Sequence, residues 1–196
     1  MKTLFLIMLF LSNTSWAFNP EHIQKSALEN DVPKSTIDTL LKYYSEHESK
    51  IENKNYVTFV DFRKPSSKDR MIVIQTDTGQ VEKYLVAHGL NSGETIAEKF
   101  SNIQDSKMSS LGLYLIQEQY TGQHGASLFL EGLSPTNSKA KERSIVMHYA
   151  DYVSDQWIAN EGRIGRSWGC FALNKDDFLQ HVIDKVKNGS LMMAFK

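Results

Sequence analysis

Cysteine is almost absent from this sequence, because Cys170 is the single one among 196 residues. A chain with one cysteine cannot form a disulfide bond within itself, so the small secreted domains held together by internal disulfides are excluded as a class. Stability must come from packing. An excess of one charge is also lacking, since 22 lysines and arginines face 23 aspartates and glutamates. The net charge of −1 argues against electrostatic binding of nucleic acid, and we expect no nucleic-acid partner.

Long hydrophobic runs are missing as well. The longest covers residues 4–11, about half of the roughly 20 residues that a helix needs to cross a bilayer core of about 30 Å. Lys2 precedes this run, and Ser15 and Ala17 place small residues at the two positions that a signal peptidase reads. The pattern predicts a signal peptide over residues 1–17, export, and no transmembrane segment in the mature chain. The alternative is a buried N-terminal helix.

The remaining chain divides into a helical part and a strand-rich part. Over residues 18–55, apolar side chains recur at helical spacing and Pro33 stands near a helix start, which predicts an N-terminal helical segment. Residues 56–196 alternate in the manner of strands, with one late helix over 174–190 that begins at the N-cap Asn174. The predicted class is therefore mainly β, of the α+β type. Strands are expected at 56–62, 71–77, 80–89, 111–120, 127–133, 143–150 and 191–195.

Cys170 lies in a stretch rich in glycine, serine and arginine, residues 162–173, and not within an apolar run. Arg163 and Arg166 are close in sequence, and a nearby cation favours the thiolate, which is the reactive nucleophile. Backbone N–H groups of a glycine-containing turn can also face a developing oxyanion. The alternative is a small buried hydrophobic side chain, since free cysteines are often fully buried.

A thiol nucleophile needs a base, and the sequence offers six histidines. Three of them end a strand or precede a glycine, where a sheet presents functional side chains: these are His88, His124 and His148. His148 lies 22 positions before Cys170 (170 − 148) and is the best placed base; the alternative is a structural histidine. The same three histidines and Cys170 could in principle form a zinc site, but no pair has the close spacing of structural zinc sites. We expect no metal and no cofactor.

The segment from His148 to Cys170 resembles the active-site segment of the L,D-transpeptidase catalytic domain family, the cysteine enzymes of bacterial peptidoglycan. Eighteen residues separate His148 from the motif Ser167-Trp168-Gly169-Cys170-Phe171-Ala172. Upstream segments, residues 86–93 and 101–116, also fit the family's strand and loop order. The resemblance covers roughly residues 56–196 and is greatest to a divergent branch of short exported members, the murein L,D-transpeptidase catalytic domain proteins.

The resemblance implies a β-sandwich fold and a role for each matching residue. Cys170 would be the nucleophile, His148 its base, and the Tyr149 carbonyl the group that orients the imidazole. Backbone amides around Gly169 would form the oxyanion hole. The partners would be peptidoglycan stem peptides, joined to the cysteine as a thioester in the periplasm or cell envelope of a bacterium. Oligomeric state stays open.

Two positions depart from the family pattern. Trp168 stands where most members have a second histidine, and Ala172 stands where an arginine is usual. We therefore expect other side chains to meet the substrate, including its carboxylates. The candidate substrate-binding residues are Ser167, Arg166, Arg163, Trp168, His88 and His124.

Two other functions use the same residues or the same fold. An L,D-carboxypeptidase-type hydrolase would resolve the thioester with water, because the choice of acceptor depends on loop shape and water exclusion. A non-catalytic periplasmic module that binds peptidoglycan would keep the fold without the chemistry. The change to Trp168 favours the binding module, whereas the presence of both Cys170 and His148 favours an enzyme.

Overall fold

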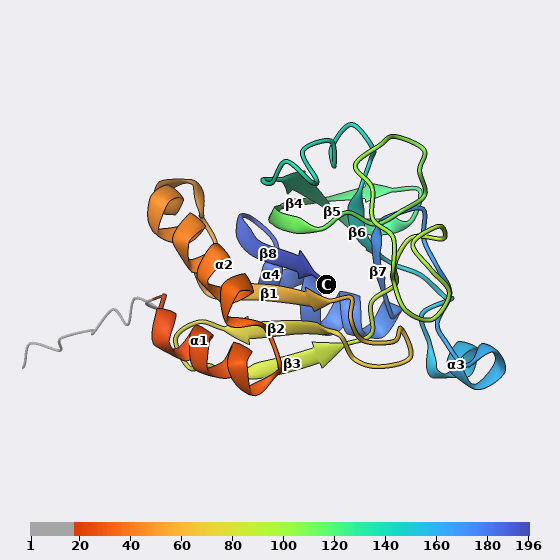
Figure 1. Cartoon of the computed structure of the whole chain (residues 1–196), viewed down its shortest axis with the longest axis horizontal. Helices are drawn as coiled ribbons and strands as arrows, with labels where there is room; N and C mark the ends of the chain where they lie inside the picture. The colour runs from red at the N-terminus through yellow and green to blue at the C-terminus, as the bar shows by residue number, and fades with distance from the viewer. Residues whose placement is uncertain (1–17) are drawn as a thin grey trace, which may run out of the picture.

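Two helices open the part of the chain that the computed structural model describes, residues 18–196 (Figure 1). The predicted signal peptide, residues 1–17, lies outside the described residues. Helix α1 spans Pro20–Glu29, and the Asn19 side chain caps it by accepting hydrogen bonds from two backbone N–H groups of the first turn. Helix α2 spans Lys34–His47 directly after Pro33 and is followed by the short 3₁₀ helix η1, Glu48–Lys50. Both helices fall in the segment predicted to be helical.

Eight strands form one mixed sheet in the order β3-β2-β1-β8-β4-β5-β6-β7. The pairs β1–β8 and β6–β7 are parallel, and the others are antiparallel. This confirms the predicted α+β class. The strands are β1 Tyr56–Asp61, β2 Met71–Gln75, β3 Val81–Tyr84, β4 Gly112–Gly122, β5 Gly125–Gly132, β6 Val146–Tyr149, β7 Phe171–Leu173 and β8 Ser190–Phe195.

Helices also lie between the late strands. A short helix, α3 (Asp155–Glu161), precedes the cysteine-containing stretch and was not predicted. The late helix consists of a π-helical part, η2 (Asp177–Val182), followed by α4 (Ile183–Val186). Asn174 caps it through its side-chain oxygen, as predicted, by accepting from the N–H groups of Asp176 and Asp177. No helix within residues 18–196 is long and apolar enough to cross a membrane.

The sheet separates two hydrophobic cores. Alternate residues of β1 point to opposite faces, as strand geometry requires: Phe59 packs with the buried residues of α1 and α2, and Val60 packs with the core on the other side. Figure 1 shows α1 and α2 together on one side of β1 and β2. The opposite core includes side chains of all eight strands and of the late helix, so the sheet curls around it.

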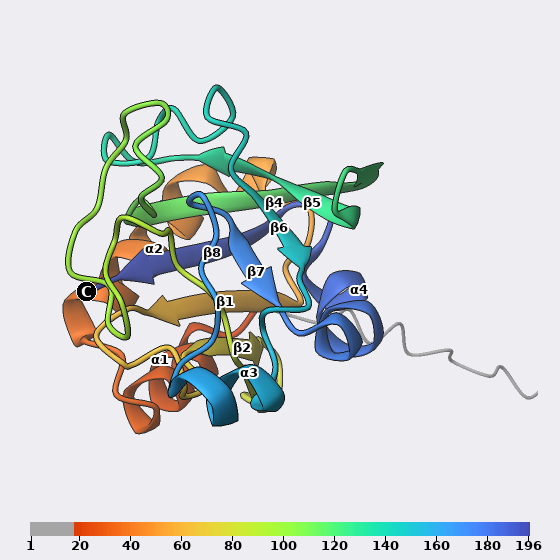
Figure 2. The same ribbon diagram turned by 90° about the vertical axis from the view of Figure 1, so that its right-hand side faces the viewer.

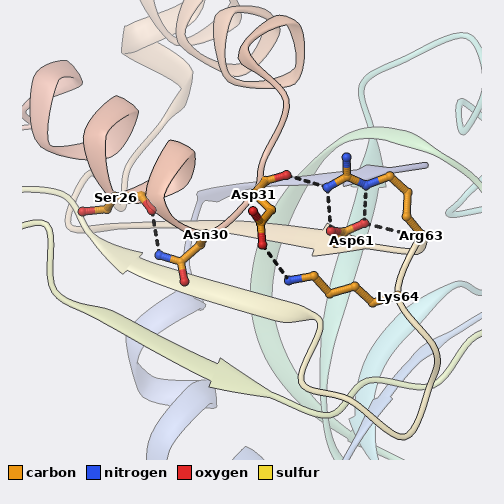
Figure 3. Close-up of polar contacts among 6 residues, drawn as sticks. All are labelled: Ser26, Asn30, Asp31, Asp61, Arg63 and Lys64. Atoms are coloured by element: carbon orange, nitrogen blue, oxygen red, sulfur yellow. Dashed lines mark hydrogen bonds and ion pairs between the residues drawn. The ribbon is translucent and has the colours of Figure 1, made fainter.

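The helical pair is also fastened to the end of β1 by buried charge (Figure 3). Asp61 is fully buried, and Arg63 binds both of its carboxylate oxygens at 2.8 Å. The same guanidinium donates to the backbone carbonyl of Asp31, in the turn between α1 and α2. Lys64 lies 3.9 Å from the Asp31 carboxylate. A bidentate pair of this kind fixes geometry as well as charge.

The two outer strands of the sheet are joined through the chain that follows β3. In this segment the Ala87 N–H donates to the Ala172 carbonyl of β7 at 2.8 Å, and the His88 carbonyl accepts from the Ser167 N–H at 2.9 Å. Figure 2 looks toward this end of the molecule, where the segment after β3 passes beside β7. These hydrogen bonds hold the stretch around Cys170 against the segment that follows β3.

Candidate active site

Cys170 ends a tight turn immediately before β7. Gly169 has φ +124°, and a β-carbon there would lie 2.7 Å from the Met108 carbonyl oxygen, so only glycine fits. The Ser167 hydroxyl donates to the Cys170 carbonyl at 2.7 Å and accepts the Gly169 N–H at 3.1 Å. Ser167 therefore fixes the turn. The Gly169 amide, which the resemblance assigns to the oxyanion hole, is bonded to Ser167 in this structure.

The parallel pairing of β6 with β7 brings His148 and Cys170 to one site. His148 is in register with Ala172, two residues after the cysteine. Both His148 and Cys170 line a cavity of about 440 Å³. Six residues proposed from the sequence line this cavity, namely Cys170, His148, His124, Arg166, Ser167 and Trp168. It is lined as well by Gln123, Arg143, Ser144, Ile145 and Tyr152.

The imidazole of His148 is buried and has one defined hydrogen bond. Its Nδ1 lies 2.8 Å from the Tyr149 carbonyl oxygen. A carbonyl only accepts, so Nδ1 carries the proton and Nε2 keeps a free lone pair. Burial lowers the pKa of His148 to about 4; the Tyr149 contact opposes this, and nearby His124 lowers the pKa further. His148 is thus neutral at pH 7 and able to accept a proton.

The Cys170 thiol is half-buried and protonated in the resting site. Burial raises its pKa, while the Val146 N–H and the charge of Arg143 act in the opposite direction. The sulfur lies 3.6 Å from the Ser144 carbonyl oxygen, to which the thiol donates. In the resting state a neutral thiol and a neutral imidazole therefore line the same cavity, and the thiol needs a base to become a nucleophile.

Arg143 lines the cavity and was not among the sequence-predicted residues. Its guanidinium makes four hydrogen bonds, all to one long loop, over distances of 2.6–3.3 Å. Its acceptors are the backbone carbonyls of Ser101 and Met108 and the hydroxyls of Ser106 and Ser110. In the sequence Arg143 is only the polar first residue of the strand predicted over 143–150, and nothing there signals contact with a loop some 40 residues earlier.

The two arginines nearest to Cys170 in sequence are engaged elsewhere. Arg166 forms an ion pair with Glu94 at 2.7 Å and also donates to the Gly93 carbonyl. Arg163 lies 3.4 Å from the same carboxylate and does not line the cavity. The expectation that these two cations favour the thiolate is therefore corrected. The arginine whose charge lowers the pKa of Cys170 is Arg143.

His88 is fully buried and lies outside the cavity. Arg70 donates to its Nδ1 at 2.8 Å, and its Nε2 donates to the Gly93 carbonyl at 3.1 Å. Neither ring nitrogen is left for a substrate. The proposal that His88 binds substrate is accordingly replaced by a structural role: it connects the buried Arg70 to the loop that carries Gly93 and Glu94.

His124 and Trp168 both line the cavity, His124 from a hairpin and Trp168 from the cysteine turn. His124 sits at the tip between β4 and β5, with its ring stacked on that of His148 at a centroid distance of 4.2 Å. Trp168 is 70% exposed, and the Lys107 ammonium lies 4.4 Å from the centre of its ring. Both residues line the cavity, and their role in binding substrate stays a prediction.

Within residues 18–196, no three histidine, cysteine, aspartate or glutamate side chains are grouped in a way that would hold a metal ion. The four candidate zinc ligands do not lie together, because His88 is outside the cavity that contains His124, His148 and Cys170.

Comparison with known proteins identifies a protein family that the chain matches. A sequence model of the L,D-transpeptidase catalytic domain matches residues 28–195. No curated protein sequence matches the chain.

Solved structures with a similar fold include the helical cell shape determining protein Pgp2 from Campylobacter jejuni, with 12% identity over 72% of this chain and 47% of that one (TM-score 0.46). An L,D-transpeptidase from Mycobacterium smegmatis has 13% identity over 72% and 59% (TM-score 0.43). An L,D-transpeptidase from Stackebrandtia nassauensis has 14% identity over 89% and 76% (TM-score 0.44). The chain spans less than two thirds of the length of the first two of these proteins.

Proposed function

Because this chain belongs to the L,D-transpeptidase catalytic domain family, we propose that it is a cysteine-dependent L,D-transpeptidase acting on peptidoglycan stem peptides. The observation that carries the proposal is the pairing of Cys170 with His148 in one cavity, where His148 is neutral and has a free Nε2. A module that only binds peptidoglycan has no need of a nucleophile next to a base.

The first half of the reaction forms a thioester. His148 Nε2 takes the proton of the Cys170 thiol, and the thiolate attacks the peptide carbonyl that precedes the terminal D-alanine of the stem. The new S–C bond creates a tetrahedral oxyanion. When it collapses, the C–N bond breaks, and the proton held by His148 passes to the leaving amine of D-alanine.

The second half of the reaction consumes the thioester. An amine from a second stem attacks the same carbonyl carbon, His148 accepts its proton, and the protonated Cys170 thiol is regenerated. Attack by water instead would release a free stem and make the protein an L,D-carboxypeptidase. The Tyr149 carbonyl keeps the imidazole in one tautomer through both halves, because it can bind only a protonated Nδ1.

Mass spectrometry of the protein incubated with disaccharide-tetrapeptide tests the proposal. We expect an adduct on the wild-type protein that is absent from the Cys170→Ser variant, followed by cross-linked stems. Adduct formation with shortened, uncross-linked stems as the only product would favour the carboxypeptidase. An intact fold with no adduct and unchanged stems would favour the binding module.

The location of the protein is part of the proposal. Peptidoglycan lies outside the cytoplasmic membrane, and the pattern of residues 1–17 supports an exported chain. N-terminal sequencing of the protein recovered from cells is expected to begin near Phe18; an intact Met1 on the active protein would contradict export by cleavage of this segment.

A further inference from the structure

Arg143 is the cation in the catalytic cavity whose charge is not neutralised by the protein. No aspartate or glutamate lines this cavity. Its other arginine, Arg166, is paired with Glu94, and elsewhere Arg63 is paired with Asp61. Within residues 18–196, no carboxylate lies within ion-pair distance of the Arg143 guanidinium. All four of its hydrogen-bond acceptors are neutral.

The guanidinium is also held rigidly. Nη1 and Nη2 together make the four hydrogen bonds to the loop that contains Ser101 and Ser110, which leaves Nε–H without an acceptor among the described residues. Nη2 lies 3.2 Å from the position that a β-carbon on Gly169 would occupy. The charge is therefore fixed directly beside the turn that carries the nucleophile, in a half-buried position where an electrostatic interaction is stronger than in bulk water.

We propose that Arg143 is an anion-binding residue of the cavity that receives a carboxylate of the substrate peptide, next to the bond that Cys170 attacks. A fixed guanidinium with a free N–H suits a carboxylate, which accepts charge-assisted hydrogen bonds. The ligand class is a peptide with a free carboxylate on the residue that leaves or on its neighbour. The identification of the ligand as a stem peptide depends on the proposed function, but the anion site itself does not.

Two alkylating reagents separate the anion site from the enzymatic reaction. Iodoacetate and iodoacetamide both form an S–C bond with the Cys170 thiolate and release iodide, but only iodoacetate carries a carboxylate. Cys170 is the only thiol in the chain, so the rate of each reaction reports on this cavity. The ratio of the two rates measures how well the cavity accepts an anion, independently of the fraction of thiolate.

We expect Arg143→Gln to lower the ratio of the iodoacetate rate to the iodoacetamide rate about tenfold, the effect of one close charge at a partly buried site. Lys141→Gln is the matched control, because Lys141 is an exposed cation two residues away that does not line this cavity. Its ratio is expected to equal that of the wild type. An equal ratio in wild type and Arg143→Gln would overturn the inference.

Arg143→Lys guards against a purely structural effect, since it keeps the charge but cannot span the four acceptors. We expect it to retain most of the preference for iodoacetate. A loss as complete as that of Arg143→Gln would assign the effect to loop packing and overturn the anion site. In parallel, stem peptides with a C-terminal carboxylate and with a C-terminal amide should differ in KM for the wild type and not for Arg143→Gln.

The two proposals can fail separately. If no peptide is processed but the alkylation ratio depends on Arg143, the proposed function fails and the anion site stands. If peptides are processed and the ratio does not depend on Arg143, the anion site fails and the function stands.

Discussion

His88 and His148 present the same local pattern and end in different surroundings. Each is preceded by apolar residues in the sequence, each is almost completely buried, and burial lowers the pKa of each to about 4. Around His88, Arg70 and the Gly93 carbonyl occupy both ring nitrogens. Around His148, only Nδ1 is occupied, by the Tyr149 carbonyl, and the ring faces the cavity of Cys170.

Under the proposed function, the difference shows what distinguishes a general base from a structural histidine in this molecule. Burial keeps both imidazoles neutral, so neutrality alone does not identify a base. A proton acceptor also needs an unoccupied nitrogen in a cavity that substrate can enter. The number of occupied ring nitrogens is therefore the informative quantity, and it can be tested.

The largest expected effect is that of His148→Ala on the rate of the reaction. Loss of the base should lower the rate of thioester formation with stem peptide by about a thousandfold, and should also slow alkylation of Cys170 at neutral pH. Rapid-quench mass spectrometry measures the first effect and thiol titration the second. Wild-type rates in a folded His148→Ala protein would contradict the assignment of the base.

The corresponding change at His88 should affect stability. His88→Ala leaves Arg70 and the Gly93 carbonyl without a partner in a buried region and creates a cavity, and we expect the free energy of unfolding to fall by about 3 kcal/mol. Urea denaturation measures this. A protein as stable as the wild type, with slower alkylation of Cys170, would mean that the two histidines had been assigned in the wrong order.

The low pKa of both histidines also predicts a dependence of stability on pH. The unfolded chain binds protons on these rings near pH 6.5, whereas the folded chain binds them only near pH 4. The contribution of the two rings to the free energy of unfolding is complete above about pH 6.5. It is lost as the pH falls toward 4, by at most about 3 kcal/mol for each ring. Urea denaturation between pH 4 and 7 should show the decline, and a smaller one in His148→Gln. An identical slope in both proteins would contradict the shift assigned to His148.

The smallest effect concerns His124, which stacks on His148 and is absent from the surroundings of His88. His124→Ala removes a nearby titratable ring and admits water to His148, and both changes raise the pKa of His148. The acidic limb of the rate profile, expected near pH 4, should move upward by no more than about one pH unit. Gln123→Ala, at the same hairpin tip, serves as the control and should leave the limb in place.

The sequence predicted the long elements, and it singled out Cys170 and His148, which line one cavity in the structure, because these signals are local. Alternation in β1 and β4, the N-cap Asn174 and the glycine before Cys170 can each be recognised within a few residues. Strand β7 was missed because its three residues are too few to show a period, and its pairing with β6 depends on a parallel crossover. Helix α3, with seven residues, is similarly short.

The rest of the site depends on contacts between distant segments. Arg143 became part of the cavity through the loop of residues 101–110, and the ion pairs of Arg163 and Arg166 depend on Glu94, some 70 residues earlier. Proximity in sequence suggested that these two arginines act on the thiol, but in the structure both lie within ion-pair distance of Glu94. Their pairing with Glu94 depends on the tertiary fold, and no local sequence pattern specifies it.

The helical pair α1 and α2 has a practical consequence for anyone who cuts this chain. The predicted division at residue 55 separates helix from strand in sequence, yet Ile23, Ile37 and Leu40 share one core with Phe59 and Ile74 of the sheet. A recombinant fragment that starts at residue 56 would present that apolar face to water and invite aggregation. Fragments intended for crystallisation, labelling or directed evolution should therefore begin no later than Phe18, so that the sheet keeps its own cover.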